Sequence, residues 1–210
     1  LDNLESILSV KGVDATMIRN IYSFTYFTGT PWWQPSVLIP AKDEPIIFAF
    51  EDEVEELREK TWINKILGYR KVEELMRAVT ENIRKLNVET VGFDVDVDAS
   101  ALLFEQFKVM HPGKKIVDTH GLIMQLRMVK DQTEIENIRK ASACAQSGLE
   151  AAIKSIRAGV TETAIAGEAH LAARRGGAES ILVYVNAGKP RVHAHPRNKE
   201  VKTGDTVMID

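Results

Sequence analysis

The residues of this sequence best suited to chemistry lie between positions 192 and 210. Two histidines, His193 and His195, stand in this segment, and its apolar run TVMI ends on the acid Asp210. A run of β-forming residues makes a rigid support that can carry a carboxylate to the rim of a pocket. Carboxylates and imidazoles are common metal ligands, but a His-X-His pair in a loop is weak evidence for a metal site, since many loop histidines are only solvated.

Two other groups of residues could take part in chemistry. Asp94, Asp96 and Asp98 alternate with valines, which could place three carboxylates on one side of a strand, but the glycine and glutamate of a calcium-binding EF-hand loop are missing at the required offsets. A solvated strand end is therefore the favoured interpretation. Trp32 and Trp33 stand between two prolines, where packing beneath a loop is favoured over a lid or a subunit contact.

The composition restricts the class of protein. The 210 residues are 44% hydrophobic and 27% charged, which is ordinary for a globular protein. A formal charge of -3 gives no basic excess for nucleic acid or an anionic membrane surface. No stretch approaches the roughly 20 apolar residues that cross a bilayer. We therefore expect neither nucleic acid nor a membrane as a partner. The single cysteine, Cys144, cannot form an internal disulfide, so we expect a cytoplasmic protein.

The chain contains two regions with different sequence patterns, and these regions position the residues named above. Through residues 1–120, β-type runs alternate with helical patterns, including a hairpin over 36–50 and an amphipathic helix over 71–86, which predicts an α/β domain. Residues 22–29 are interpreted as an aromatic turn-like segment closed by Gly29. Residues 121–130 are predicted to be a linker to a second domain over 131–210.

The second region begins with a helix start signal. Asp131 and Glu134 have the spacing of a capping box, and helical periodicity then runs to Gly159. Thr161 is placed to cap a second helix over 162–175. Strands are predicted at 180–185 and 206–210, joined by a long loop. Two helices and two strands leave apolar surface that needs a partner.

Four segments, taken in order, resemble one known family. They are IYSFTYFTG at 21–29, LRMVKDQTEIENIRKA at 126–141, AGVTETAIA at 158–166, and the loop and strand from Gly188 to Asp210. Together they resemble the Xaa-Pro dipeptidase (prolidase), aminopeptidase P and creatinase family across essentially the whole chain.

The resemblance implies a two-domain enzyme. It consists of an α/β N-terminal domain of the creatinase/prolidase type, followed here by the first helices and strands of an α+β pita-bread catalytic domain. In this family a dinuclear centre of two divalent ions (Mn, Co or Zn) is held by two aspartates, a histidine and two glutamates. Asp210 matches the first aspartate, and the other four ligands are expected beyond residue 210. The chain as given is therefore expected to bind no metal and to be inactive by itself.

The family also has a histidine that contacts substrate in the loop before this strand. The spacing back from Gly204 matches it to His193, whereas the spacing forward from Gly188 matches it to His195. His193 is favoured as the catalytic and substrate-binding residue, with His195 as the alternative register. Val192 departs from the family pattern, which has proline there.

The implied activity is metal-dependent hydrolysis of Xaa-Pro bonds in proline-containing di- or oligopeptides. The alternatives are a creatinase-like hydrolase that works without metal and a non-enzymatic peptidase-like binding domain. The resemblance also implies a homodimer, in which Trp32 and Trp33 would approach the substrate site of the partner subunit.

Overall fold

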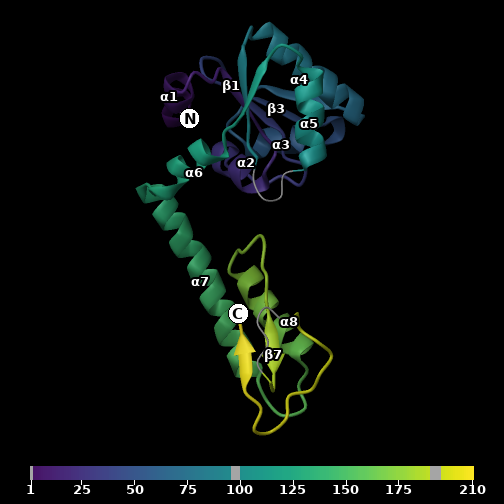
Figure 1. Ribbon diagram of the computed structural model, residues 1–210. Helices are drawn as coiled ribbons and strands as arrows, with labels where there is room; N and C mark the ends of the chain where they lie inside the picture. Colours follow the sequence, from purple (N-terminus) through teal and green to yellow (C-terminus); the bar gives the residue numbers. More distant parts are fainter. Residues whose placement is uncertain (1, 96–99, 190–194) are drawn as a thin grey trace. The chain divides into compact units, whose positions relative to one another are not determined.

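The computed structural model describes residues 2–95, 100–189 and 195–210, and the chain divides into two compact units, Leu1–Val129 and Lys130–Asp210 (Figure 1). The boundary lies near the end of the predicted linker, residues 121–130. Most of the predicted linker is helical, because residues 121–128 belong to helix α6 (His120–Met128). Its Ile123 is fully buried in the core of the first unit.

The first unit is built on a six-stranded mixed sheet. In the order β4-β3-β2-β1-β5-β6, only β2 runs antiparallel to its neighbours, so the carboxyl ends of the other strands meet at one edge. The antiparallel pairing of β2 with β3 confirms the predicted hairpin. The strands are β1 (Ala15–Ile18), β2 (Val37–Pro40), β3 (Ile46–Phe50), β4 (Ile66–Tyr69), β5 (Thr90–Phe93) and β6 (Lys115–Asp118).

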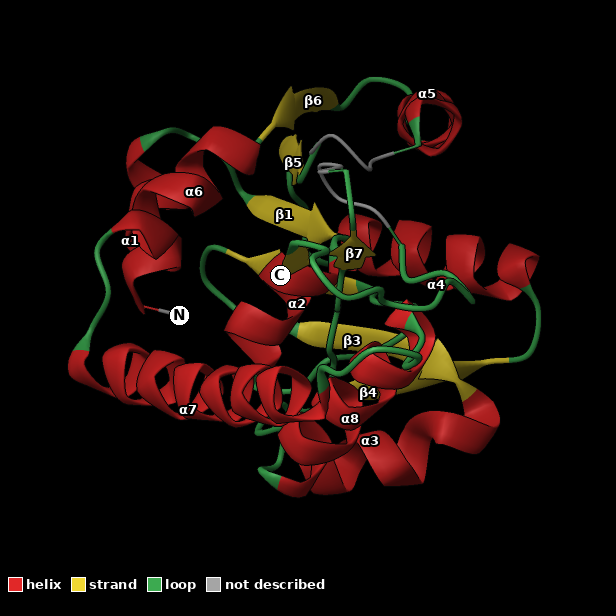
Figure 2. Ribbon diagram, turned by 90° about the horizontal axis from the view of Figure 1, so that it is seen from below, coloured by secondary structure: helices red, strands yellow, loops and turns green. Residues whose placement is uncertain are grey.

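Helices cover both faces of this sheet because its strands are apolar on both sides. Along β3, Ile47 and Ala49 face one core, whereas Ile46 and Phe48 face the other. The first core is covered by α1 (Asp2–Val10), α2 (Ile21–Thr28), α3 (Val54–Lys60) and α6, and the 3-10 turn η1 (Glu51–Glu53) leads into α3. The second is covered by α4 (Val72–Lys85) and α5 (Ala101–Met110). Figure 2 shows α1 and α6 on one side of the sheet and α4 and α5 on the other.

Helix α2 corrects the prediction of an aromatic turn at residues 22–29. The Asn20 side chain caps the helix by accepting hydrogen bonds from the amides of Tyr22 and Ser23, and Gly29 ends it in a left-handed conformation (φ 82°). Phe24 and Phe27 lie one turn apart and are both buried in the first core. A separation of three positions between these two rings is typical of one face of a helix, but the many aromatic residues favoured the interpretation as a turn.

Gly92 in the middle of β5 is required by the packing of two threonines. The hydroxyls of Thr16 and Thr119 form a buried hydrogen bond of 2.6 Å beside it. A β-carbon at position 92 would stand 2.9 Å from Thr16 Oγ1 and would collide with the methyl group of Thr119. We therefore expect Gly92→Ala to lower the free energy of unfolding by about 2 kcal/mol.

Urea denaturation followed by tryptophan fluorescence measures this loss, since Trp32, Trp33 and Trp62 all lie in the first unit. Gly121→Ala is the matched control, because a β-carbon at that helical position meets no atom within 4 Å. We expect the control to be neutral or slightly stabilising. Equal unfolding midpoints for the two variants would contradict the assigned packing.

The second unit pairs two helices with a short β-ribbon. Helix α7 (Gln132–Ser155) begins with the predicted capping box and packs along α8 (Glu162–Arg175). The ribbon consists of antiparallel β7 (Val185–Ala187) and β8 (Val207–Ile209), so the first strand begins later than the predicted 180–185. In both units, none of the helices among the described residues has the length and apolarity to cross a membrane.

Candidate active-site ribbon

The β7–β8 ribbon has one face toward the core and one face that carries polar groups. Val185 and Ala187 are fully buried and pack in the core with Val207 and Ile209. Since side chains alternate along a strand, the intervening residues lie on the other face. These are Tyr184, Asn186, Met208 and Asp210, with Asn186 opposite Met208 in the register.

Asp210 is held at the end of this ribbon by its backbone. Its amide donates to the carbonyl of Tyr184 at 2.9 Å, and its carbonyl accepts from the amide of Tyr184 at 2.7 Å. The two residues are therefore a directly opposed pair, whose side chains share one face. The exposed Asp210 thus has the placement on a strand end that the sequence predicted, while its role as a metal ligand stays a prediction.

His195 lies beside the same face. Its imidazole packs against the ring of Tyr184, with the ring centroids 5.3 Å apart and the planes at 57°. Tyr184 therefore contacts His195 through its ring and pairs with Asp210 through its backbone, although the three residues are separated in sequence. His193, the favoured histidine of the sequence analysis, lies outside the described residues.

Asn186, like Tyr184, is a polar residue on this face that the sequence analysis did not identify. It is 1% exposed, and neither its amide nitrogen nor its amide oxygen has a hydrogen-bond partner among the described residues. A buried amide without partners costs free energy, so such a group usually bonds a ligand, water or another chain segment. Asn186 therefore offers both a donor and an acceptor on the face of the ribbon that also carries Asp210.

A buried ion pair holds the loop that leads from β7 toward β8. The Glu162 carboxylate is fully buried and accepts from Arg197 Nη2 at 2.7 Å and Nε at 2.9 Å. It also accepts from the amides of Ala187 at 2.8 Å and Arg197 at 3.0 Å. The hydrogen bonds from Arg197 are the main reason that the pKa of Glu162 falls from its ordinary 4.5 to about 2. One carboxylate thus fixes both flanks, residues 187 and 197, of the segment that carries the two histidines.

Backbone hydrogen bonds extend this clamp along the start of α8. The amide of Glu162 donates to the carbonyl of Lys199 at 3.0 Å, and the amide of Val201 donates to the carbonyl of Val160 at 2.8 Å. The Lys199 ammonium in turn donates to the carbonyl of Ala187. The return of the loop toward β8 is therefore fixed in position by the helix start, and its register determines where Asp210 emerges.

The donor set present here is too small for a metal centre. Nowhere in residues 2–95, 100–189 and 195–210 do three or more histidine, cysteine, aspartate or glutamate side chains gather as a metal site requires. Asp210 provides a single carboxylate, whereas a dinuclear centre needs several bridging and terminal oxygens. The described residues therefore do not form such a site by themselves.

The two tryptophans have different environments in the first unit. Trp32 is partly buried against the core, and its indole Nε1 donates to Glu53 Oε2 at 2.9 Å. Trp33 is 89% exposed. Trp32 is therefore a packing residue and Trp33 a surface residue, which agrees with the expectation that packing beneath a loop is favoured for at least one of them.

This difference predicts unequal effects of truncation. Trp32→Ala removes core contacts and leaves Glu53 without its donor, so we expect it to lower the free energy of unfolding by about 2 kcal/mol. Trp33→Ala is the matched control and should change stability by less than about 0.5 kcal/mol. Urea midpoints of the two variants measure both effects. A larger loss in Trp33→Ala than in Trp32→Ala would contradict the assignment.

Two family descriptions match the chain in the order in which its two units occur. Residues 1–129 match the creatinase/prolidase N-terminal domain, and residues 136–210 match metallopeptidase family M24. The first match alone covers more than half of the chain.

Similar proteins and structures agree with these matches. An Xaa-Pro dipeptidase of Lactobacillus helveticus is 29% identical over 221 residues, spanning 100% of this chain and 60% of the relative. The prolidase structure from Pyrococcus furiosus has a TM-score of 0.84 at 25% identity, covering 100% of this chain and 64% of that one. The fold also matches an X-Pro aminopeptidase from Thermotoga maritima MSB8, with a TM-score of 0.88, 24% identity, and coverage of 100% and 59%.

The chain thus spans about 60% of the length of the curated relatives that it matches. The resemblance noted in the four sequence segments is confirmed by the two matched domains and by the shared fold. The chain belongs to the creatinase/prolidase family, with that family's N-terminal domain followed by residues of an M24 metallopeptidase domain.

Proposed function

We propose that the polypeptide carrying this chain is a peptidase that hydrolyses the bond preceding proline in Xaa-Pro dipeptides or longer peptides. The observation that carries the proposal is Asp210, an exposed acid fixed opposite Tyr184 at the end of β8, within the residues that match the metallopeptidase family. The names of the relatives, Xaa-Pro dipeptidase and prolidase, supply the substrate class.

The proposal includes dependence on two divalent ions, for which Mn, Co and Zn are the candidates. Asp210 is proposed as one ligand, and the other donors are proposed to lie outside these 210 residues. Carboxylate-rich centres accept several divalent ions, so the donor types alone do not select one. His193, or His195 in the alternative register, is proposed to contact the substrate. The packing of His195 on Tyr184 supports a position on the same face as Asp210.

A substrate series tests the proposed class. The complete polypeptide with added Mn²⁺ should cleave Ala-Pro and should cleave Ala-Ala far more slowly, since only the first presents a proline after the scissile bond. Loss of the intact dipeptide measures the reaction for both peptides, since Ala-Ala has no proline to release. Creatine serves as the third substrate, because hydrolysis of creatine without Ala-Pro cleavage would assign the chain to the metal-free alternative. Binding of Ala-Pro with no cleavage would favour a non-enzymatic role.

A homodimer is proposed as well, with the partner's substrate site approached by the tryptophan segment. The exposed Trp33 is the better candidate for such a contact, since the indole of Trp32 is engaged by Glu53. A cytoplasmic location is proposed from the single cysteine, Cys144. Sedimentation of the complete polypeptide tests the dimer, and a monomeric mass at micromolar concentration would exclude it.

A further inference from the structure

His111 is a buried histidine that the proposed peptidase chemistry does not use. It directly follows α5 and is 4% exposed. Its Nδ1 donates to the carbonyl of Phe107 at 2.7 Å, because a carbonyl oxygen can only accept. The other ring nitrogen, Nε2, is also buried and has no hydrogen-bond partner among the described residues. The environment therefore suits the neutral imidazole, whose single proton is on Nδ1 and whose Nε2 carries only a lone pair.

The ring of His111 is part of the packing that holds the C-terminal end of α5 on the second core. Phe107 is the one buried residue among the ten of α5, all of which the structure describes. Its ring centroid lies 5.1 Å from that of Phe93 in β5 and 4.4 Å from that of the imidazole. Helix α5 thus depends on few buried contacts, and elements of this kind open locally before the rest of a domain unfolds.

The charges near His111 disfavour a further positive charge on its ring. Arg84 in the last turn of α4 and Lys114 in the turn before β6 act on it as cations. Among the described residues no acid bonds to the ring. Two acids of the adjoining segments are held by lysines instead, Glu89 by Lys114 and Glu105 by Lys108, each at 2.9 Å. A proton added to Nε2 would therefore create a buried charge without an acceptor.

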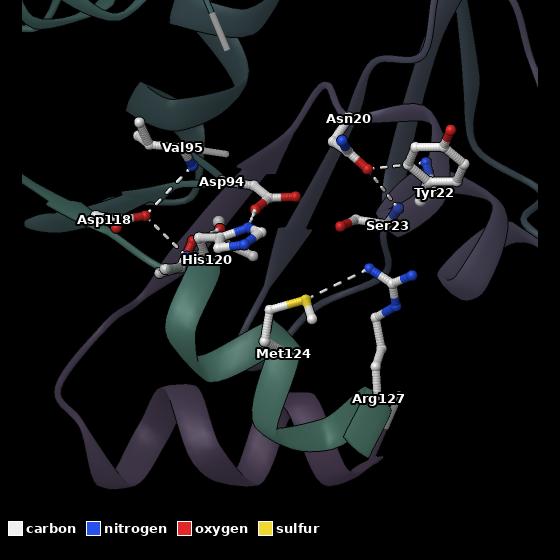
Figure 3. Close-up of polar contacts among 11 residues, drawn as sticks. Asn20, Tyr22, Ser23, Asp94, Val95, Asp118, His120, Met124 and Arg127 are labelled. Carbon is white, nitrogen blue, oxygen red and sulfur yellow. Dashed lines mark hydrogen bonds and ion pairs between the residues drawn. The ribbon is translucent and has the colours of Figure 1, made fainter. Parts of the chain in front are cut away.

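His120, the second histidine of the first unit, has a different environment (Figure 3). Its Nδ1 bonds Asp94 Oδ1 at 2.8 Å, and its side chain is 32% exposed. Asp94 itself is 1% exposed, which corrects the predicted solvated strand end; Asp96 and Asp98 lie outside the described residues. A charged His120 thus has both water and a carboxylate beside it, whereas a charged His111 would have neither.

We propose that His111 is an acid-sensitive switch on α5. The neutral ring packs on Phe107 and keeps the end of the helix on the second core, and uptake of one proton at Nε2 detaches that end. The proton comes from the solvent during local opening of the helix end, when Nε2 reaches water. The switch concerns the first unit alone and does not depend on peptidase activity.

The direction of the pH dependence follows from burial. Burial of the ring is the main cause that lowers the pKa of His111 below its ordinary 6.5; the bond to the Phe107 carbonyl opposes this, and Arg84 and Lys114 add to it. The unfolded chain, with the ordinary pKa, therefore takes up the proton more readily than the folded chain. The stability from the neutral ring is fully present above pH 6.5 and is lost as the pH falls from 6.5 through the lower pKa of the folded chain.

Urea unfolding of the 210-residue chain at about pH 7.5 and about pH 5.5, followed by tryptophan fluorescence, tests the switch. His111→Asn cannot take up a proton and keeps a donor near the position of Nδ1. Between the two pH values, the unfolding equilibrium constant of the parent should rise about threefold to tenfold more than that of the variant. His170→Asn, which removes an exposed histidine of α8, is the matched control and should behave as the parent. Equal rises in the parent and His111→Asn would overturn the proposal.

Two measurements on the parent chain decide the matter even if His111→Asn does not fold. Nuclear magnetic resonance should show the ring of His111 titrating with a midpoint below 6.5, and a midpoint at or above 6.5 would overturn the proposal. Hydrogen exchange, corrected for intrinsic rates, should show that the α5 amides lose protection at about pH 5.5, including the His111 amide that donates to Lys108. The α4 amides should keep theirs. Equal loss in both helices would mean that α5 is not released separately, and the proposal would fail.

Discussion

Replacing Asp210 by asparagine in the complete polypeptide is expected to lower kcat/KM for Ala-Pro by at least about a thousandfold. Asparagine keeps the shape of the side chain and the backbone pairing with Tyr184, but it removes the negative charge that a divalent ion requires of a ligand at this position. Steady-state kinetics measures the loss, and elemental analysis of the purified protein measures bound metal. Both should fall together.

The matched control is Glu168→Gln, which also removes one negative charge from an exposed site of the same unit, on α8. This variant should retain the activity and metal content of the parent. If Asp210→Asn also kept both, Asp210 would not be a ligand, and the assignment of the ribbon as an active-site element would be withdrawn.

Replacing Glu162 by glutamine is expected to destabilise the second unit by about 2 kcal/mol at neutral pH. Breaking one partner of a fully buried ion pair typically costs about 3–5 kcal/mol, and the smaller value is expected here because Arg197 keeps part of its side chain in water. Hydrogen exchange is the sharpest measurement, since the amides of Ala187 and Arg197 both donate to this carboxylate. Both amides should lose protection in the variant, and Glu168→Gln should leave them unchanged.

The same carboxylate predicts a dependence of stability on acid. The pKa of Glu162 is about 2 in the folded chain and ordinarily 4.5, so the unfolded chain binds the proton more readily. The stability from the clamp is therefore fully present above pH 4.5 and is lost as the pH falls from 4.5 toward 2. Glu162→Gln should lack this part of the acid dependence. Equal loss of amide protection with falling pH in the parent and the variant would show that the clamp does not titrate as assigned.

Local signals in the sequence predicted much of the fold. The capping box at Asp131 and Glu134, the periodicity of α4 and the polar break between β2 and β3 each involve residues close together in the chain, and all three were confirmed. The interpretation of residues 22–29 as a turn is wrong because it gave more weight to the aromatic residues than to a usable helix signal, the Asn20 cap. Helix α6 was missed for a different reason. Its position depends on Ile123 packing into the distant first core.

The two buried contacts of carboxylates, Glu162 with Arg197 and Asp94 with His120, could not be predicted because the partners are remote in sequence. Glu162 and Arg197 are separated by 35 positions, and Asp94 and His120 by 26. As sequence, Glu162 is an ordinary acid in the first turn of a helix, and Asp94 resembles a solvated strand end. Only the folded chain shows that both carboxylates are buried. Asp210 could be singled out from the sequence because a run of β-forming residues ends on it, and the family resemblance adds its expected role as a metal ligand.

If the polypeptide carrying this chain is a metal-dependent Xaa-Pro peptidase, as proposed, removal of metal should abolish its activity. The complete polypeptide is dialysed against a chelator, assayed with Ala-Pro, and assayed again after addition of Mn²⁺, Co²⁺ or Zn²⁺ in turn. We expect proline release to cease without metal and to return with at least one of these ions. Undiminished cleavage by the metal-free protein, or no cleavage of Ala-Pro with any of the three ions, would contradict it.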